Sequence, residues 1–235
     1  ELGITLNPVC AAGHSLGEYT SLVATGALSL ADGVRLVHLR GRLMQDAVPL
    51  GVGAMAAVIG LTLDEVKEVC LESADGEVCQ AANVNAPTQV VISGHKGAVD
   101  RAVAAIEKKG TAKVVPLRVS APFHCDLMRP VADELNEAFA KITWHKPKCK
   151  IVANSTATAI DTIDEIRKAL YMQTFSPVLW AQSVLTMESL NPEVYIELGP
   201  GSVLSGLVRK ICKGKRPYPI SEVKELLAAA EILRG

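Results

Sequence analysis

Residues 8–25 have the sequence PVCAAGHSLGEYTSLVAT, and this stretch decides the fold. The apolar run at 8–12 predicts a short strand, and residues 16–25 predict a helix that Gly26 ends. Short apolar runs alternate in this way with amphipathic helical stretches along most of the chain. This alternation indicates an α/β architecture with a largely parallel sheet.

The turn between that strand and helix carries the pattern G-x-S-x-G at residues 13–17 (GHSLG). Glycines at these two places permit a sharp strand-to-helix turn that exposes a serine hydroxyl. The amide of Leu16, at the positive end of the helix, would face the oxygen on which negative charge develops. We therefore predict Ser15 as a nucleophile. The alternative is a glycine-rich turn in which Ser15 only caps the helix.

The middle of the chain has a different order of elements. Its patterns predict strand, helix, two strands, helix and strand, which is the order of a ferredoxin-like module. We expect this module at residues 51–118, inserted between the two parts of a large subdomain at 1–50 and 119–235. The predicted elements of the module are strands at 54–59, 78–83, 89–93 and 113–117 and helices at 62–73 and 95–109. Those predicted outside it are a strand at 194–198 and helices at 30–45, 126–142, 162–173, from 176 and from 203.

Composition excludes several classes of partner. Hydrophobic residues make up 49% of the chain and the formal net charge is −1, so neither nucleic acid nor a membrane is expected as a main partner. The six cysteines have no paired spacing, which predicts reduced thiols and no metal site. Residues 1–6 show no targeting segment. We expect a cytoplasmic protein, or one of the plastid stroma.

A nucleophilic serine needs a general base, and the chain has five histidines. We expect His38, His95 and His145 to be solvated, and His14 to pack beside the site because the turn points it away from Ser15. His124 lies in a loop between a strand and a long helix, where side chains reach the edge of an α/β sheet. It is either the base or an ordinary loop histidine.

Arg40 is the most informative residue of the helix predicted at 30–45. Its spacing places it on the apolar stripe with Leu36 and Leu43, away from the polar face. A guanidinium stays charged, so its burial requires an anion. That anion is either an internal Asp or Glu or a carboxylate of the substrate.

Five short stretches, in this order, carry a resemblance to a known family: 13–19 (GHSLGEY), 39–45 (LRGRLMQ), 83–87 (NVNAP), 121–124 (APFH) and 197–201 (ELGPG). Together they resemble the malonyl-CoA:acyl-carrier-protein transacylases of fatty-acid synthesis. The resemblance covers essentially the whole chain. It implies an α/β-hydrolase-like large subdomain with a ferredoxin-like small one. The substrates implied are malonyl-CoA and acyl carrier protein, with no permanently bound cofactor and a monomeric enzyme.

The resemblance also implies the site residues. Ser15 would be acylated, His124 would be its base, and Arg40 would pair with the malonyl carboxylate. Leu16 would supply an oxyanion amide, and the main-chain carbonyl of Gln173 would orient the histidine.

Four further residues are expected on the substrate side. Asn85 and Asn83 would lie near the pantetheine arm, with His14 beside them. Phe123 resembles the form that selects malonyl, because a bulky ring leaves little room for a methyl branch.

One part of the family pattern is not matched. The glycine-rich N-terminal segment, whose glutamine amide helps to form the oxyanion hole, is absent, so we expect the chain to be part of a longer active enzyme. Loss of one oxyanion donor costs about a hundred- to thousand-fold in rate. Two other functions stay open: a serine esterase or thioesterase, and a silent scaffold that binds acyl carrier protein.

Overall fold

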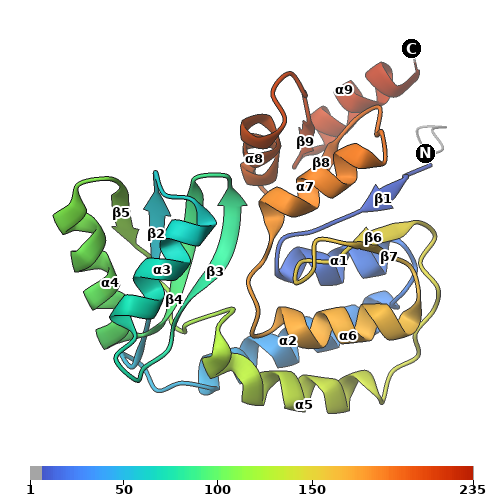
Figure 1. Cartoon of the computed structure of the whole chain (residues 1–235). Coiled ribbons are helices and arrows are strands. Elements are labelled where there is room, and N and C mark those ends of the chain that lie inside the picture. Colours follow the sequence, from blue (N-terminus) through green and yellow to red (C-terminus); the bar gives the residue numbers. More distant parts are fainter. Residues whose placement is uncertain (1–6, 235) are drawn as a thin grey trace.

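The computed structural model describes residues 7–234, so the expectation for residues 1–6 lies outside it. Two bodies lie side by side in Figure 1: a small sheet with its helices on the left and a larger α/β body on the right. This mixed α/β arrangement confirms the predicted fold class. Within residues 7–234, no helix is both long and apolar enough to cross a bilayer.

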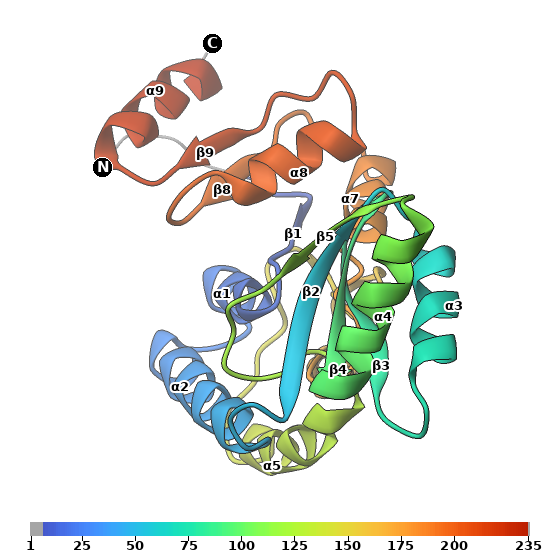
Figure 2. The ribbon, with the colours of Figure 1, turned by 90° about the vertical axis from the view of Figure 1, so that its left-hand side faces the viewer.

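The small sheet consists of neighbouring antiparallel strands in the order β3-β4-β2-β5. This is the strand order of a ferredoxin-like module. Helices α3 and α4 cover one face of the sheet (Figure 2), and α3 begins with a capping box formed by Thr62 and Glu65. The elements are β2 (Gly53–Ile59), α3 (Leu63–Ser73), β3 (Cys79–Ala86), β4 (Gln89–His95), α4 (Lys96–Lys109) and β5 (Lys113–Pro116). We propose 51–118 as the limits of this subdomain.

The larger body has two short groups of strands. Strand β1 pairs in parallel with β6, β7 pairs antiparallel on the other side of β6, and β8 and β9 form a separate parallel pair. The strands are β1 (Cys10–Ala11), β6 (Lys150–Val152), β7 (Ala159–Ile160), β8 (Ile196–Leu198) and β9 (Tyr218–Ile220). The helices are α1 (Leu16–Ala24), α2 (Leu30–Asp46), η1 (Asp126–Met128), α5 (Arg129–Phe139), α6 (Ile163–Gln173), α7 (Trp180–Ser189), α8 (Val203–Ile211) and α9 (Val223–Arg234).

Several predicted boundaries were wrong for physical reasons. The helix expected at 126–142 is a 3₁₀ turn followed by α5, with Pro130 in the first turn of α5. The helix expected from 176 begins at Trp180, because Val178 first pairs with β3. The strand expected at 194–198 is the shorter β8, at 196–198. The sequence patterns did not reveal β6, β7, β9 or α9 at all.

The two bodies are joined through β3 and the segment before α7. The Val178 amide donates to the carbonyl of Ala82 at 2.9 Å, and the Val84 amide donates to the carbonyl of Val178 at 2.8 Å. Each body has its own apolar core, one between α1, α2, α5 and α6 and one beneath α3 and α4. The junction therefore holds the end of β3 beside the turn that precedes α1 (Figure 1).

Candidate active site

Ser15 occupies a strained turn between β1 and α1. Its φ is 53° and its ψ is −104°, and its side chain makes no capping hydrogen bond, so the capping alternative is wrong. The turn requires glycine at position 13, because a Cβ on Gly13 would lie 2.0 Å from the carbonyl oxygen of Gly17. A Cβ on Gly17 would meet nothing within 4 Å. Glycine is therefore a steric requirement at the first position of the motif only.

His124 is hydrogen-bonded on both ring nitrogens. Its Nε2 lies 2.7 Å from Ser15 Oγ, and its Nδ1 lies 2.8 Å from the main-chain oxygen of Gln173. A carbonyl only accepts, so Nδ1 carries the proton and Nε2 is free to accept the serine proton. The loop between β5 and η1 holds His124 at a φ of 59°. The structure thus brings together Ser15, His124 and Gln173, the three residues that the resemblance implied.

The histidine is held in its neutral form. Burial, followed by the positive charge of Arg40, lowers the pKa of His124 from its usual 6.5 to about 3. The hydrogen bond to Gln173 opposes this change but does not reverse it. At neutral pH the ring is therefore uncharged, and Nε2 has a free lone pair for the serine proton.

Arg40 is buried against the nucleophile. It is 6% exposed, and its Nη2 donates to Ser15 Oγ at 2.8 Å and to Gln173 Oε1 at 3.3 Å. The guanidinium carbon lies 5.7 Å from the centre of the Tyr19 ring. In the described part of the chain, no carboxylate lies within salt-bridge distance of Arg40. The alternative of an internal ion pair is therefore wrong for these residues, and the cation is available to an anion from outside.

Asn154 belongs to the site, although sequence reasoning missed it. Its Oδ1 accepts from the Ser15 amide at 2.7 Å, and its Nδ2 donates to the Gly13 carbonyl at 2.8 Å. The side chain is fully buried and fixes both ends of the nucleophile turn. Asn154 lies two residues after the end of β6, and because the sequence patterns did not reveal β6, they gave no signal for this residue.

The predicted substrate-side residues separate into two groups. His14 Nε2 donates to Asn85 Oδ1 at 2.9 Å, and both residues line a hollow of about 360 Å³ with the 197–200 stretch. Asn83 is buried and pairs through its backbone with the segment before α7. Phe123 packs against the apolar clusters instead of lining this hollow. Leu16, 51% exposed, begins α1, where the first amides have no acceptor within the helix.

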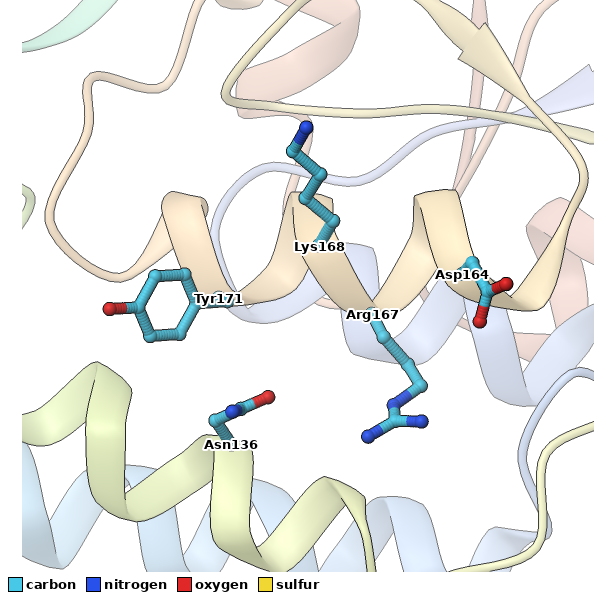
Figure 3. A pocket seen from close by; sticks show the side chains of 5 residues that line it. All are labelled: Asn136, Asp164, Arg167, Lys168 and Tyr171. Carbon is cyan, nitrogen blue, oxygen red and sulfur yellow. The ribbon is translucent and has the colours of Figure 1, made fainter.

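The other histidines are mostly peripheral. His38 and His145 are exposed, as predicted. His95 is different, because its Nδ1 accepts a hydrogen bond of 2.9 Å from the Val78 amide. A second hollow, of about 300 Å³, lies between α5 and α6 (Figure 3). None of the predicted site residues lines it; its lining residues are Asn136, Asp164, Arg167, Lys168 and Tyr171.

A serine at a strand-to-helix turn with a neutral histidine in contact places the protein among the serine enzymes of acyl transfer and acyl hydrolysis. The acyl transferase domain family matches residues 2–227. The chain belongs to this family, and within it to the malonyl-CoA:acyl-carrier-protein transacylases, as the resemblance of its motifs implied.

The relatives share most of their length with this chain. It is 45% identical over 225 residues to the malonyl CoA-acyl carrier protein transacylase of Escherichia coli K12, covering 96% of this chain and 73% of that protein. The crystal structure of the corresponding Xanthomonas oryzae enzyme has a TM-score of 0.93 at 46% identity, with 96% of this chain and 72% of that chain covered. A malonyl-transacylase in complex with a type II PKS acyl-carrier protein has a TM-score of 0.93 at 39% identity, with 97% of this chain and 74% of that chain covered.

Proposed function

We propose that this chain transfers a malonyl group from malonyl-CoA to the phosphopantetheine thiol of acyl carrier protein, through a malonyl ester on Ser15. The single observation that carries the proposal is the contact of Ser15 Oγ with both His124 Nε2, at 2.7 Å, and Arg40 Nη2, at 2.8 Å. His124 accepts the serine proton, and Arg40 supplies a fixed positive charge. The relatives act on these same two substrates by name.

In the first half-reaction, Ser15 Oγ attacks the thioester carbonyl while His124 Nε2 takes the serine proton. Negative charge then develops on the former carbonyl oxygen, which the amide of Leu16 stabilises at the helix N-terminus. Collapse of this intermediate breaks the carbon–sulfur bond. Coenzyme A leaves as its thiol with the proton held by His124, and Ser15 remains as a malonyl ester.

In the second half-reaction, the thiol of acyl carrier protein attacks the ester and gives its proton to His124. The carbon–oxygen bond then breaks, and His124 returns the proton to Ser15. In both halves the guanidinium of Arg40 pairs with the malonyl carboxylate, and it exchanges its contact with Ser15 for this stronger partner. Every step is assigned to side chains and main-chain amides, so the proposed mechanism uses no bound cofactor.

The proposal includes the setting of the reaction. We place it in the cytoplasm, since the cysteines within residues 7–231 are free. The hollow beside His14 and Asn85 is the proposed path of the pantetheine arm, because it opens next to the nucleophile turn and is lined by a mixture of polar and apolar groups. A monomer carries all the proposed steps.

Transfer kinetics test this proposal and separate it from its rivals. With malonyl-CoA and acyl carrier protein both varied, we expect the parallel double-reciprocal lines of a ping-pong enzyme, and malonyl-carrier protein as the main product. Rapid release of free malonate instead would favour the esterase. Ser15→Ala should abolish transfer, and an active Ser15→Ala protein would exclude the mechanism.

The role of Arg40 has its own test. Arg40→Lys keeps the charge but loses the planar fork of donors. We expect kcat/KM for malonyl-CoA to fall by about 10- to 100-fold and that for acetyl-CoA to change much less. An equal loss with both thioesters would mean that Arg40 supports the fold and does not bind the carboxylate.

A further inference from the structure

Glu18 is a buried carboxylate with no part in the mechanism above. It lies in the first turn of α1, three residues after Ser15, and is 1% exposed. Burial raises the pKa of Glu18 from its usual 4.5 to about 7, against the effect of its hydrogen bonds and of the charge on Arg40. A buried acid without a salt bridge is costly to the fold, so its presence beside the nucleophile calls for a function.

The hydrogen bonds of Glu18 lead to Gln173. One carboxylate oxygen, Oε2, accepts from Gln173 Nε2 at 2.9 Å and from the Asn154 amide at 3.1 Å. Gln173 Nε2 also donates to the main-chain oxygen of Ser15, at 2.9 Å. Both protons of the Gln173 amide are therefore used, one on the Ser15 carbonyl oxygen and one on Glu18 Oε2.

This arrangement determines which way the Gln173 amide faces. With its nitrogen between two acceptors, its oxygen Oε1 must turn to the other side, where it accepts from Arg40 Nη2 at 3.3 Å. The reversed amide would set Oε1 against the oxygens of Glu18 and Ser15 and would set two donors, its own and that of Arg40, against each other. Glu18 Oε2 and the Ser15 carbonyl together thus select the orientation that Arg40 needs.

Gln173 also serves the base, because its main-chain oxygen accepts from His124 Nδ1 at 2.8 Å. Gln173 therefore contacts both Arg40 and His124, and Glu18 in turn contacts Gln173. We propose that Glu18 is a positioning residue that sets Gln173, and through it Arg40, for recognition of the malonyl carboxylate. The inference rests on the proposed function, since it assumes that Arg40 binds that carboxylate.

The charged and titratable groups around Glu18 are few. Arg40 faces it from α2 and Tyr19 adjoins it on α1, while Gln173 on α6 and Asn154 after β6 contribute neutral donors. The requirement is for an acceptor at the place of Oε2, which the oxygen of a glutamine side chain also supplies. Glu18→Gln should therefore preserve the orientation of Gln173, and Glu18→Ala, which leaves only the Ser15 carbonyl as an acceptor, should weaken it.

The experiment compares malonyl-CoA and acetyl-CoA as donors for wild type, Glu18→Ala and Glu18→Gln, with thermal unfolding of each protein. We expect Glu18→Ala to lower kcat/KM for malonyl-CoA by about 10- to 100-fold, the effect of one charge-assisted hydrogen bond, and to raise its KM. Its preference for malonyl over acetyl should fall about tenfold, while Glu18→Gln should keep that preference. Glu165→Gln, which changes the exposed cap of α6, is the matched control and should keep wild-type activity.

Two further measurements keep the test decisive. If Glu18→Ala does not fold, Glu18→Asp keeps the charge but withdraws it from Gln173, and it should show the same loss of preference. In a double-mutant cycle, Gln173→Ala with Glu18→Ala should cost no more than Gln173→Ala alone. Equal losses for both donors, or additive losses in the cycle, would overturn the proposal. Failure of wild type to transfer malonyl would instead refute the proposed function.

Discussion

The free energy of unfolding should depend on pH through His124, and His124→Asn isolates that dependence. In the fold the pKa of His124 is about 3, against 6.5 for an ordinary histidine, because the ring is buried next to Arg40. Below pH 6.5, His124 therefore binds a proton in the unfolded chain but not in the folded protein. The contribution of His124 to the free energy of unfolding is complete above pH 6.5 and is lost as the pH falls from 6.5 towards 3.

The magnitude follows from the two pKa values. At about pH 4.5 the unfolded histidine is two pH units below its pKa, which corresponds to about 2.7 kcal/mol of lost stability at 1.36 kcal/mol per unit. Asparagine suits the position because it tolerates the φ of 59° and can donate to the Gln173 carbonyl. The asparagine side chain does not titrate. Any pH-independent effect of the substitution on the free energy of unfolding therefore cancels when the values at two pH values are subtracted.

Urea unfolding of both proteins at about pH 8 and about pH 4.5 measures the effect. We expect the free energy of unfolding of wild type to fall by about 2.7 kcal/mol more than that of His124→Asn between these values. The same acidification acts on every other group in both proteins and leaves this difference intact. Parallel pH dependence of the two proteins would show that the fold does not hold the His124 ring in its neutral form.

Four other substitutions test three separate parts of the structure. Gly13→Ala should reduce acylation by more than about a hundredfold, because the new Cβ would lie 2.0 Å from the Gly17 oxygen. Gly17→Ala, whose new Cβ meets no atom within 4 Å, should leave the melting temperature unchanged. Equal effects of the two substitutions on folding would contradict this geometry. Asn154→Ala leaves the Ser15 amide without its acceptor, so we expect a loss of about 1–3 kcal/mol in urea unfolding together with slower acylation; full activity would show that the turn needs no support. Thr162→Ala removes the cap of α6 and should cost about 1 kcal/mol in stability without changing kcat/KM; a change in kcat/KM would mean that the start of α6 influences Gln173.

Local patterns were sufficient to predict the main features of the fold. The turn at Ser15 is encoded by Gly13 and by the strand and helix that flank it, all within a few residues. The burial of Arg40 follows from the period of one helix. The small sheet was predictable because its strands are five or more residues long, apart from β5, and are separated by clear turns and caps.

The parts that the sequence did not reveal depend on contacts distant along the chain. Strands β6 and β7 have only three and two residues, too few for any period to show. Asn154 reaches Ser15 across 139 positions, and Gln173 reaches Glu18 across 155. The sequence showed Glu18 only as part of the motif at residues 13–19. It did not reveal that Glu18 is buried, because this burial depends on α6 and on the segment after β6. From the sequence, His124 was either the base or an ordinary loop histidine. The fold decides between these roles, because it places the ring against Ser15.

Intact-protein mass spectrometry after incubation with malonyl-CoA is the most direct test of the central claim. We predict a single malonyl adduct that peptide mapping assigns to Ser15, that Ser15→Ala does not form, and that disappears when acyl carrier protein is added. An adduct that persists in Ser15→Ala, or no adduct on a protein that still transfers malonyl, would contradict the assignment of Ser15 as the nucleophile.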